Sequence, residues 1–573
     1  MDSNAKDGCG RLVFSREKAG AGSATKGSHL FVLVAVCSAL FLLRANSLPL
    51  ADPEESRCAL IVRDMVAHGH WLVPHLDGQP YFEKPAPFFW LAALGVKLTG
   101  SAELGGRLAP ALAGLLAVAV TYAFARRVFA SAYAGLLAGL VLATSGEFLF
   151  MARWYRMDMP FGAAMWAALW WLWRSEDRRL RQEPVSKAGT WAGFYLFTGA
   201  ATLFKGPAGL GLPAMVVLAY FLLSRQHRRI LEFFHPMGIG PYLLVSAPWY
   251  VAVSLHEPGY FQEFFLRQNF QRFAGGSNLG HHWPGILYVP ILLAGLLPWT
   301  VFLPGIAIRH FPRRWRLRNE RPAMLMLWLA VLAPLALFSI CNTKLASYIL
   351  PVFPPLAVLI GGLLASWTLS HRPDRLMKLG SQALLATVAV LPAVPLAVEL
   401  WLRAPSWWLL VLGSAIVVTL WVMRSALSHA HRARFVGLGV AGIVAVFLYL
   451  ILHTAPTAYE WMSTRSLVQA VDPVELRHAD VCSWPDNKLS FLFYSDLDRI
   501  REFRRSNPED LKTLVEWLAS DRRVYCLVTG ADRLAELQAT SVGVLSIVSR
   551  SGQCWLVTNV GRSTGNPPGG NLR

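Results

Sequence analysis

The sequence predicts a polytopic α-helical membrane protein with about 13 transmembrane helices and a small α/β domain at its C-terminus. Hydrophobic residues make up 54% of the 573 residues and charged residues only 16%, whereas soluble domains carry about 25% charged residues. The apolar residues gather in runs close to the ~20 residues that a bilayer requires. After about residue 455 these runs shorten and charges become frequent.

Thirteen apolar runs are candidate spans. Their ranges are 30–49, 107–125, 131–149, 158–173, 189–204, 206–223, 238–255, 285–308, 323–341, 346–369, 379–399, 405–423 and 435–453. The connecting segments alternate between basic ones and ones that hold acids and aromatics. Because basic loops stay in the cytoplasm, we expect residues 1–29 to be a cytoplasmic tail and the C-terminus to lie outside.

The segment 50–106 is the longest loop between the spans of the membrane domain, which we place at 30–454. It holds two apolar stretches, Ser56 to His68 and Phe88 to Leu98, that predict amphipathic helices lying on the membrane. Between them the chain is broken into turns by Pro74, Gly78, Pro80 and Pro85.

Residues 455–561 are predicted to form an α/β domain on the outer face. The short apolar runs 490–494, 524–529, 542–548 and 554–560 indicate strands. Asn507 followed by Pro508 marks the start of a helix that runs to about Ala519. The polar tail 562–573 is predicted to be disordered.

The net charge of +19 does not indicate nucleic-acid binding, because the basic residues form short clusters between apolar runs. The seven cysteines contain no CxxC pair and no zinc spacing. The sequence does not decide whether two of the three cysteines Cys482, Cys526 and Cys554 form a disulfide outside the cytoplasm.

No metal cage is evident in the sequence. His68-Gly69-His70 and His281-His282 each offer two ligands without a third at a fixed spacing. Glu83 with a loop histidine leaves a structural divalent metal open, so we assign neither metal ligands nor a cofactor.

The candidate site residues are polar groups of the outer-face loops. Basic residues are normally depleted from outer loops by the positive-inside rule, so cations there require an explanation. Binding of an anionic lipid headgroup would explain the presence of Lys84, Lys205, Arg272 and Lys344. The acids Glu54, Glu55 and Asp158 could orient a nucleophile or stabilise a developing sugar cation. Tyr81 and Tyr348 accompany them at the same face.

Structural interpretations compete with each of these. Glu54 and Glu55 could simply complement the dipole at the start of an interfacial helix. Lys205 and Lys344 could be snorkelling residues at span ends. Arg153 and Arg156 could merely pair with Asp158.

The motifs resemble the polyprenyl-phosphate-dependent glycosyltransferases of the GT-C type. The first loop, with YFEKP at its end, is most similar to the bacterial branch that contains the lipid A aminoarabinose transferases, and more distantly to protein O-mannosyltransferases. The similarity continues through ARWYRMDMPFGAA, LFKGPAGLGLP, FFLRQNFQRFAG, GLLPWTVFLP and KLASYILPVFPP, and it covers roughly 30–370.

The resemblance implies roles for individual residues. It matches Glu54-Glu55 to the family's carboxylate pair, Lys84 and Arg272 to its carrier-phosphate ligands, and Asp158, Tyr81 and Tyr348 to its remaining motif positions. The sequence departs from the family pattern at two positions: Glu54 replaces the usual Asp, and Cys58 stands where a Tyr is common. These departures leave the class of enzyme intact, but they leave the donor sugar and the acceptor open.

The implied activity is that of an inverting glycosyltransferase of the bacterial inner membrane. It would move a sugar from undecaprenyl phosphate to a periplasmic acceptor, with aminoarabinose and lipid A phosphate as the nearest substrates and another glycan, lipid or protein as the alternative acceptor. A transporter predicts charged or broken helices at mid-membrane and internal repeats, which the sequence does not display. A degenerate binding module is argued against by Lys84, Arg272 and Tyr348.

Overall fold

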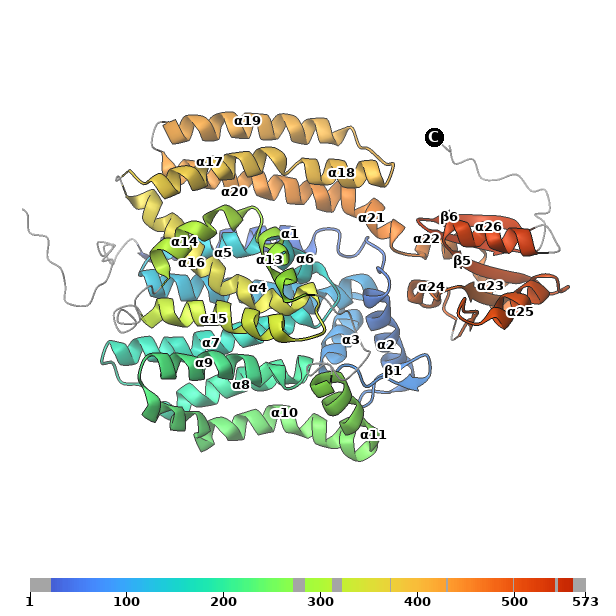
Figure 1. Cartoon of the computed structure of the whole chain (residues 1–573), viewed down its shortest axis with the longest axis horizontal. Coiled ribbons are helices and arrows are strands. Elements are labelled where there is room, and N and C mark those ends of the chain that lie inside the picture. Colours follow the sequence, from blue (N-terminus) through green and yellow to red (C-terminus); the bar gives the residue numbers. More distant parts are fainter. Residues whose placement is uncertain are drawn as a thin grey trace, which may run out of the picture.

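The structure is a computed structural model that describes residues 22–271, 284–311, 322–370, 373–428, 431–497, 499–541 and 545–559. It consists of a long helical bundle and, at one end of it, a domain built on a sheet (Figure 1). The predicted tails, Arg272 and the His281-His282 pair lie wholly or largely outside the described residues.

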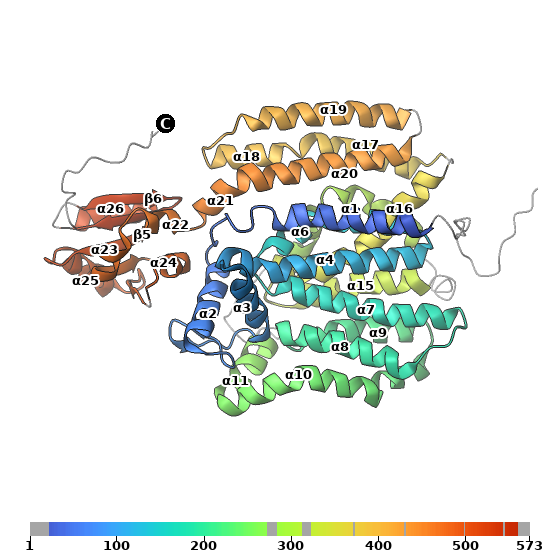
Figure 2. The same cartoon turned by 180° about the vertical axis from the view of Figure 1, so that it is seen from behind.

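The bundle is formed by mostly apolar helices together with the shorter, more polar segments η1 and η2. They are α1 (Gly22–Leu42), α4 (Ala102–Phe129), α5 (Ala132–Ala143), α6 (Gly146–Arg153), α7 (Asp158–Leu180), α8 (Lys187–Lys205), α9 (Ala208–Leu223), η1 (His227–Phe234), α10 (Pro236–His256), α11 (Gly259–Phe261), η2 (Gln262–Gln271), η3 (Gly285–Leu287), α13 (Tyr288–Gly295), η4 (Trp299–Phe302), α14 (Leu303–His310), α15 (Pro322–Ile340), η6 (Ala346–Val352), α16 (Phe353–Leu369), α17 (Arg375–Val390), α18 (Ala393–Trp401), α19 (Trp408–Ser428), α20 (Arg432–Tyr449), η7 (Leu450–Thr454) and α21 (Ala455–Trp461). The continuous segment η6–α16 is the best buried, and α17 to α20 form an outer layer (Figures 1 and 2).

Each predicted span overlaps one helix or a run of consecutive helices. Within the described part of the chain, 7 helices are long and apolar enough to cross a membrane, or up to 9 if each bent pair is one span. The chain is therefore a multi-pass helical membrane protein. The number thirteen stays a prediction, because α1, α7, α8 and α9 do not meet these criteria of length and composition.

Two predicted spans are bent rather than straight. α5 and α6 meet at 68°, and the segments Gly285–Gly295 and Trp299–His310 meet at 105°. At the first bend, Thr144 Oγ1 donates to the carbonyl of Leu140 (2.5 Å) and Ser145 Oγ to that of Val141 (2.7 Å). Hydroxyls that bond back to the preceding turn favour such bends. Trp299 Nε1 donates to Thr144 Oγ1 (2.9 Å), so the two bends contact one another.

The first loop contains the two predicted helices, here α2 (Glu54–His68) and α3 (Pro87–Thr99). Between them a hairpin pairs β1 (His75–Leu76) with β2 (Gln79–Pro80). Its turn residues Asp77 and Gly78 have φ of 53° and 69°, the left-handed backbone that an Asp-Gly hairpin turn requires. The loop lies at the end of the bundle that faces the sheet domain (Figures 1 and 2).

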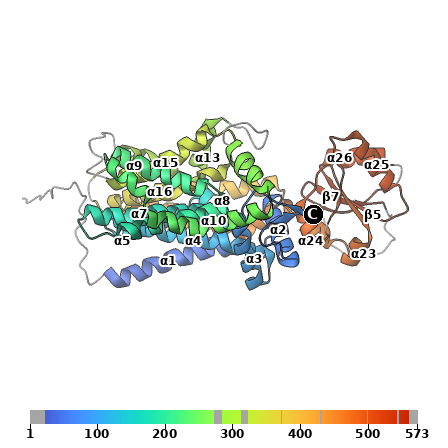
Figure 3. The same cartoon turned by 90° about the horizontal axis from the view of Figure 1, so that it is seen from below.

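The C-terminal domain is an α/β domain, as predicted. Its five-stranded sheet has the order β4-β3-β5-β7-β6, in which β3, β4 and β5 are parallel and β6 and β7 antiparallel. Its elements are α22 (Arg465–Gln469), α23 (Pro473–His478), β3 (Asp480–Trp484), α24 (Leu489–Tyr494), β4 (Arg501–Glu502), α25 (Pro508–Leu518), β5 (Val524–Thr529), α26 (Ala531–Thr540), β6 (Ser546–Ser551) and β7 (Cys554–Thr558). Figure 3 places α25 and α26 on one side of the strands and α23 and α24 on the other.

Most strand predictions for this domain were correct. β5, β7 and the helix capped by Asn507 are confirmed. β6 (Ser546–Ser551) overlaps the predicted run 542–548, of which 542–544 lie outside the described residues. The run 490–494 was predicted as a strand but belongs to helix α24, and the strands β3 and β4 were missed. Cys482 and Cys526 are register partners on β3 and β5, and both are free, as is Cys554.

The sheet domain is held against the first loop through α24. Asp52 Oδ1 accepts from the Ser490 amide (2.8 Å), and its other oxygen accepts from the Ser490 hydroxyl. Tyr494 donates to Glu103 Oε1 (3.0 Å) and accepts from the Leu50 amide (2.8 Å). The C-terminal domain therefore braces the loop that carries four of the nine candidate residues, namely Glu54, Glu55, Tyr81 and Lys84.

Candidate active site

A row of alternating charges runs across the end of the bundle nearest the first loop. It consists of Lys205, Asp158, Arg156, Glu54 and Arg57, and we call it the charged row. α8 ends at Lys205, α7 begins at Asp158, and α2 begins at Glu54. Helix ends from three parts of the chain therefore meet at one face, because these helices are held together by the apolar core behind them.

Asp158 is the centre of the row and is only 1% exposed. Its Oδ1 accepts from Lys205 Nζ at 2.6 Å, and its Oδ2 lies 2.9 Å from Arg156 Nε. A buried carboxylate that lies between two cations stays ionised and fixes both of them in place. The competing interpretation that Lys205 merely snorkels does not account for this contact.

Arg156 links the buried part of the row to the first loop. Its Nε lies 3.9 Å from Glu54 Oε2, and Arg57 Nη1 donates to the other oxygen of Glu54 (3.4 Å). Burial by itself lowers the pKa of the Arg156 guanidinium, but Asp158 and then Glu54 raise it above its ordinary value. Arg156 is therefore a permanent cation at the site.

Two aromatic side chains border the row. Lys205 Nζ lies 4.8 Å from the ring centroid of Tyr348 and 5.3 Å from that of Phe161. Such cation–π contacts hold an ammonium without neutralising it. Tyr348 begins the central η6–α16 segment, so its position is set by the best-buried part of the bundle.

The end of the first loop approaches the row through Arg57. Glu54, Tyr81 and Glu83 all act electrostatically on Arg57, so these side chains share one neighbourhood. The Tyr81 hydroxyl donates to Glu83 Oε2 (3.4 Å), and Lys84 Nζ donates to the Glu83 carbonyl (3.2 Å). Lys84 is half-buried, and its ammonium group is carried on the segment that follows the β1–β2 hairpin.

Glu55, predicted to be catalytic, is not part of the row. It is fully buried, and its two oxygens accept from Arg107 Nε (2.9 Å) and Nη2 (2.6 Å). The amides of Ala51 and Tyr155 complete its hydrogen bonds. Consecutive helical positions point about 100° apart, so Glu54 faces the row and Glu55 faces the interior.

Three other basic residues are placed as follows. Lys344 is buried and donates to the carbonyl of Cys341, just past the end of α15. Arg153 does not pair with Asp158; it donates to the carbonyls of Leu40 (2.7 Å) and Leu43 (2.9 Å) and so caps α1. Arg272 lies outside the described residues.

The partner of Glu55, Arg107, was not identified from the sequence. Arg107 lies at the start of a predicted span and is 2% exposed, with further hydrogen bonds to the carbonyls of Ala45, Leu48 and Pro49. The only available signal was a charge at the edge of an apolar run. Buried Glu399 of α18, which accepts from Tyr449 and Thr454, is a second charge in a region that the sequence analysis treated as uncharged.

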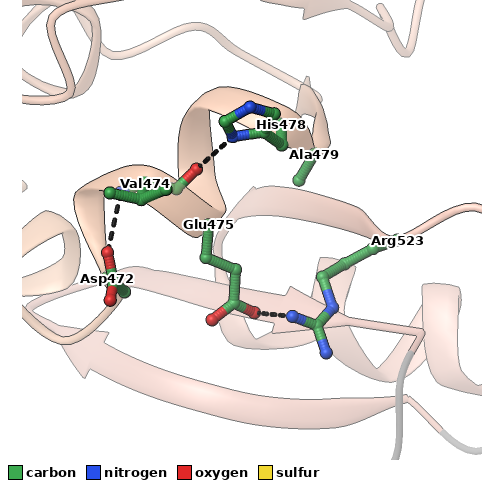
Figure 4. Close-up of a pocket in the computed structure, with 6 residues that line it drawn as sticks. All are labelled: Asp472, Val474, Glu475, His478, Ala479 and Arg523. Carbon is green, nitrogen blue, oxygen red and sulfur yellow. Dashed lines mark hydrogen bonds and ion pairs between the residues drawn. The ribbon is translucent and has the colours of Figure 1, made fainter.

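A pocket on the C-terminal domain offers no comparable chemistry. It is lined by Asp472, Val474, Glu475, His478, Ala479 and Arg523 (Figure 4). Its charged groups are already paired, because Glu475 forms an ion pair with Arg523 and also accepts from Tyr525. The charged row is therefore the stronger candidate for an active site.

Comparisons with known proteins agree with this architecture. The family described as dolichyl-phosphate-mannose-protein mannosyltransferase matches residues 83–251, which include Lys84, Asp158 and Lys205. The crystal structure of ArnT from Cupriavidus metallidurans bound to undecaprenyl phosphate superimposes with a TM-score of 0.73 at 23% identity, over 94% of this chain and 99% of that one. The chain thus has the GT-C fold.

Fold and family together define the class: the protein is a membrane glycosyltransferase. An undecaprenyl phosphate-α-4-amino-4-deoxy-L-arabinose arabinosyl transferase of Edwardsiella ictaluri is 32% identical over 428 residues, 74% of this chain and 76% of the relative. A relative of the same description from Pectobacterium carotovorum is 31% identical over 435 residues, again 74% and 76%. The chain belongs to this family of arabinosyl transferases.

Proposed function

We propose that the protein transfers 4-amino-4-deoxy-L-arabinose from undecaprenyl phosphate to a phosphate of lipid A. The description of the relatives supports the donor, and the acceptor rests on the resemblance stated from the sequence motifs. The observation that carries the chemistry is the charged row, in which buried Asp158 fixes Lys205 and Arg156 at the end of the bundle. Cations held in advance at the place where negative charge develops stabilise a departing phosphate.

The leaving group is the phosphate of the lipid carrier. We assign its binding to Lys84 and Lys205 as point charges, to Tyr348 beside Lys205, and to Arg272 by resemblance alone. Lys344 is buried, so we assign it the role of positioning η6 and hence Tyr348. Positive charge at this point matters most when the bond to the sugar breaks, since the phosphate then gains charge.

The acids have different tasks. Asp158 is a positioning residue, because both its oxygens are taken by the cations that it orients. Glu54 is half-exposed and is the carboxylate we assign to the acceptor side. A lipid A phosphate is already ionised at neutral pH, so the reaction needs no general base.

The proposed topology follows the alternation of the loops. We place the N-terminus in the cytoplasm, the charged row and the domain 455–561 in the periplasm, and the thirteen predicted spans in the inner membrane. The contacts between α24 and the first loop favour a common side for the C-terminal domain and the site.

The Lys84→Ala variant tests the transfer directly. Lipid A from the native host is compared by mass spectrometry in the wild type, a deletion strain, and deletion strains complemented with wild type, Lys84→Ala or Lys97→Ala. We expect a pentosamine mass increment that disappears on deletion and returns with the wild type and with Lys97→Ala, but not with Lys84→Ala. Lys97 is the matched control, since it is an exposed lysine of the same loop whose ammonium lies over Trp71.

Two results would decide against parts of this proposal. If lipid A is unchanged in every strain although the protein is made, the aminoarabinose assignment is wrong, and other periplasmic glycans and glycoproteins become the acceptors to examine. If Lys84→Ala restores the increment as well as wild type does, Lys84 does not hold the carrier phosphate.

A Glu54→Gln variant tests the nature of the acceptor. Because an ionised phosphate needs no base, we expect kcat to fall by only about 10-fold, less than the ~100- to 10,000-fold that a general acid or base contributes, with the shape of the pH–rate profile unchanged. The measurement is the initial rate of sugar transfer as a function of pH in detergent. If the wild-type rate depends on pH and this dependence disappears in Glu54→Gln, Glu54 acts as a general base and the acceptor is a hydroxyl.

A further inference from the structure

Four potential metal ligands gather where α2 ends and the β1–β2 hairpin begins. Asp64 lies in the last turns of α2, His68 and His70 follow it, and His75 opens β1. Asp64, His70 and His75 form the one group among the described residues whose ligand atoms all lie within 4.8 Å of one another. We propose that this trio, the loop site, binds a divalent transition-metal ion, with zinc as the preferred occupant.

The side chains are oriented as metal ligands are. His70 Nδ1 lies 2.7 Å from Asp64 Oδ2, and the rings of His70 and His75 lie 4.0 Å apart between centroids. His75 Nδ1 lies 2.9 Å from the carbonyl oxygen of Val73. A carbonyl only accepts, so the proton is on Nδ1 and the lone pair of His75 is on Nε2. Histidine ligands of metals are typically fixed by such an outer hydrogen bond.

The donor set suits zinc. Two imidazoles and one carboxylate are common zinc ligands, at about 2.0–2.2 Å from the ion. The ligand atoms of the three side chains all lie within 4.8 Å of one another, so one ion can be shared among them. His68 Nδ1 lies 3.0 Å from the other oxygen of Asp64, so a water molecule or His68 completes the coordination.

The backbone around the loop site is held independently of any ion. Trp90 Nε1 donates to the Trp71 carbonyl (2.8 Å), and Trp249 Nε1 donates to the Leu72 carbonyl (3.2 Å). The Tyr81 amide donates to the Pro74 carbonyl (2.7 Å). The segment between His70 and His75 is thus arranged before an ion arrives, which reduces the ordering cost of binding.

An ion here would connect two parts of the first loop. Asp64 belongs to the helix that begins at Glu54, whereas His75 belongs to the hairpin that leads into Tyr81 and Lys84. The loop site therefore braces the segment that presents Lys84. It stands apart from the charged row in its residues, and the inference does not depend on the proposed reaction.

The test uses the full-length protein in detergent, stripped of metal with a chelator. Zinc affinity is measured by competition with a chromophoric chelator, and bound zinc is counted by elemental analysis after gel filtration. The variants are His70→Gln and His75→Gln, with His478→Gln as the matched control. His478 is an exposed histidine of the C-terminal domain whose Nδ1 lies near a backbone carbonyl in the same way as that of His75.

We expect the wild type and His478→Gln to bind one zinc ion more than either loop variant. Loss of a direct ligand should weaken the affinity by more than the about 10–100-fold that loss of an outer partner costs. Zinc should raise the unfolding temperature of the wild type and of His478→Gln, and raise that of the loop variants less. Unfolding of the metal-free variants at the wild-type temperature establishes that they fold.

Either of two results overturns the proposal. If His70→Gln and His75→Gln bind as many zinc ions as the wild type and with the same affinity, any zinc sits elsewhere. If the metal-free wild type binds none of zinc, cobalt or nickel, the trio is only a hydrogen-bonded cluster.

Discussion

Replacing Lys205 with methionine is expected to reduce kcat by about 100- to 1,000-fold, the range seen when one group that stabilises the charge of a transition state is removed. Lys205 Nζ lies 2.6 Å from Asp158 and over the ring of Tyr348. Methionine keeps most of the apolar side chain and removes the ammonium group, with its charge and its hydrogen bond to Asp158. The measurement is the initial rate of sugar transfer by purified protein with saturating carrier-linked donor.

The same helix provides the control. Lys187 is at the other end of α8, its side chain is 71% exposed, and it lies 3.6 Å from Glu232. We expect Lys187→Met to keep wild-type activity and Lys205→Arg to recover part of it. A Lys205→Met protein with unchanged kcat and an unchanged unfolding temperature would mean that the ammonium group has no part in the reaction.

The largest effect on stability is expected from Arg107→Ala. This change leaves Glu55 buried without its partner and removes the donors to three carbonyls of the segment that follows α1. Removing one member of a buried ion pair costs about 3–5 kcal/mol. The measurement is the free energy of unfolding in mixed detergent micelles, with Arg126→Ala as the control because Arg126 is an exposed arginine of the same helix.

A double-mutant cycle separates pairing from packing. If Glu55 and Arg107 act as a pair, the loss in Glu55→Ala/Arg107→Ala should fall short of the sum of the single losses by about 0.5–3 kcal/mol, the range for residues in direct contact. Glu55→Gln should lower stability more than it lowers kcat per folded molecule. If Glu55→Gln instead lowers kcat per folded molecule more than it lowers stability, Glu55 takes part in catalysis, as the sequence predicted.

Much of the site could be found from the signs of its charges. Lys205 and Asp158 stood out because charged residues at the outer ends of apolar runs are costly there. The sequence could not pair them, since they are 47 residues apart and meet only when α7 packs on α8. It also could not separate Glu54 from Glu55, which are adjacent in the chain and face opposite environments.

Short apolar runs were the least reliable part of the fold prediction. The run at 490–494 is long enough for either a short strand or about one and a half helical turns. It forms helix α24, which packs against helix α2 of the first loop, and these tertiary contacts stabilise the helix. The membership of Asp64 and His75 in the loop site was invisible for a related reason. Asp64 is one helical turn before His68, and His75 comes close only through the hairpin.

The sequence by itself determined the helical membrane class, the first loop with its two helices, the α/β character of the C-terminal domain, and the family. These follow from local quantities: the length of apolar runs, the charges at their ends, the turn residues and the motifs. Only the tertiary structure decided which charges meet. The Glu55–Arg107 pair, the charged row and the loop site each join residues from separate elements, and their contacts depend on how the apolar faces of the helices pack, which no local pattern encodes.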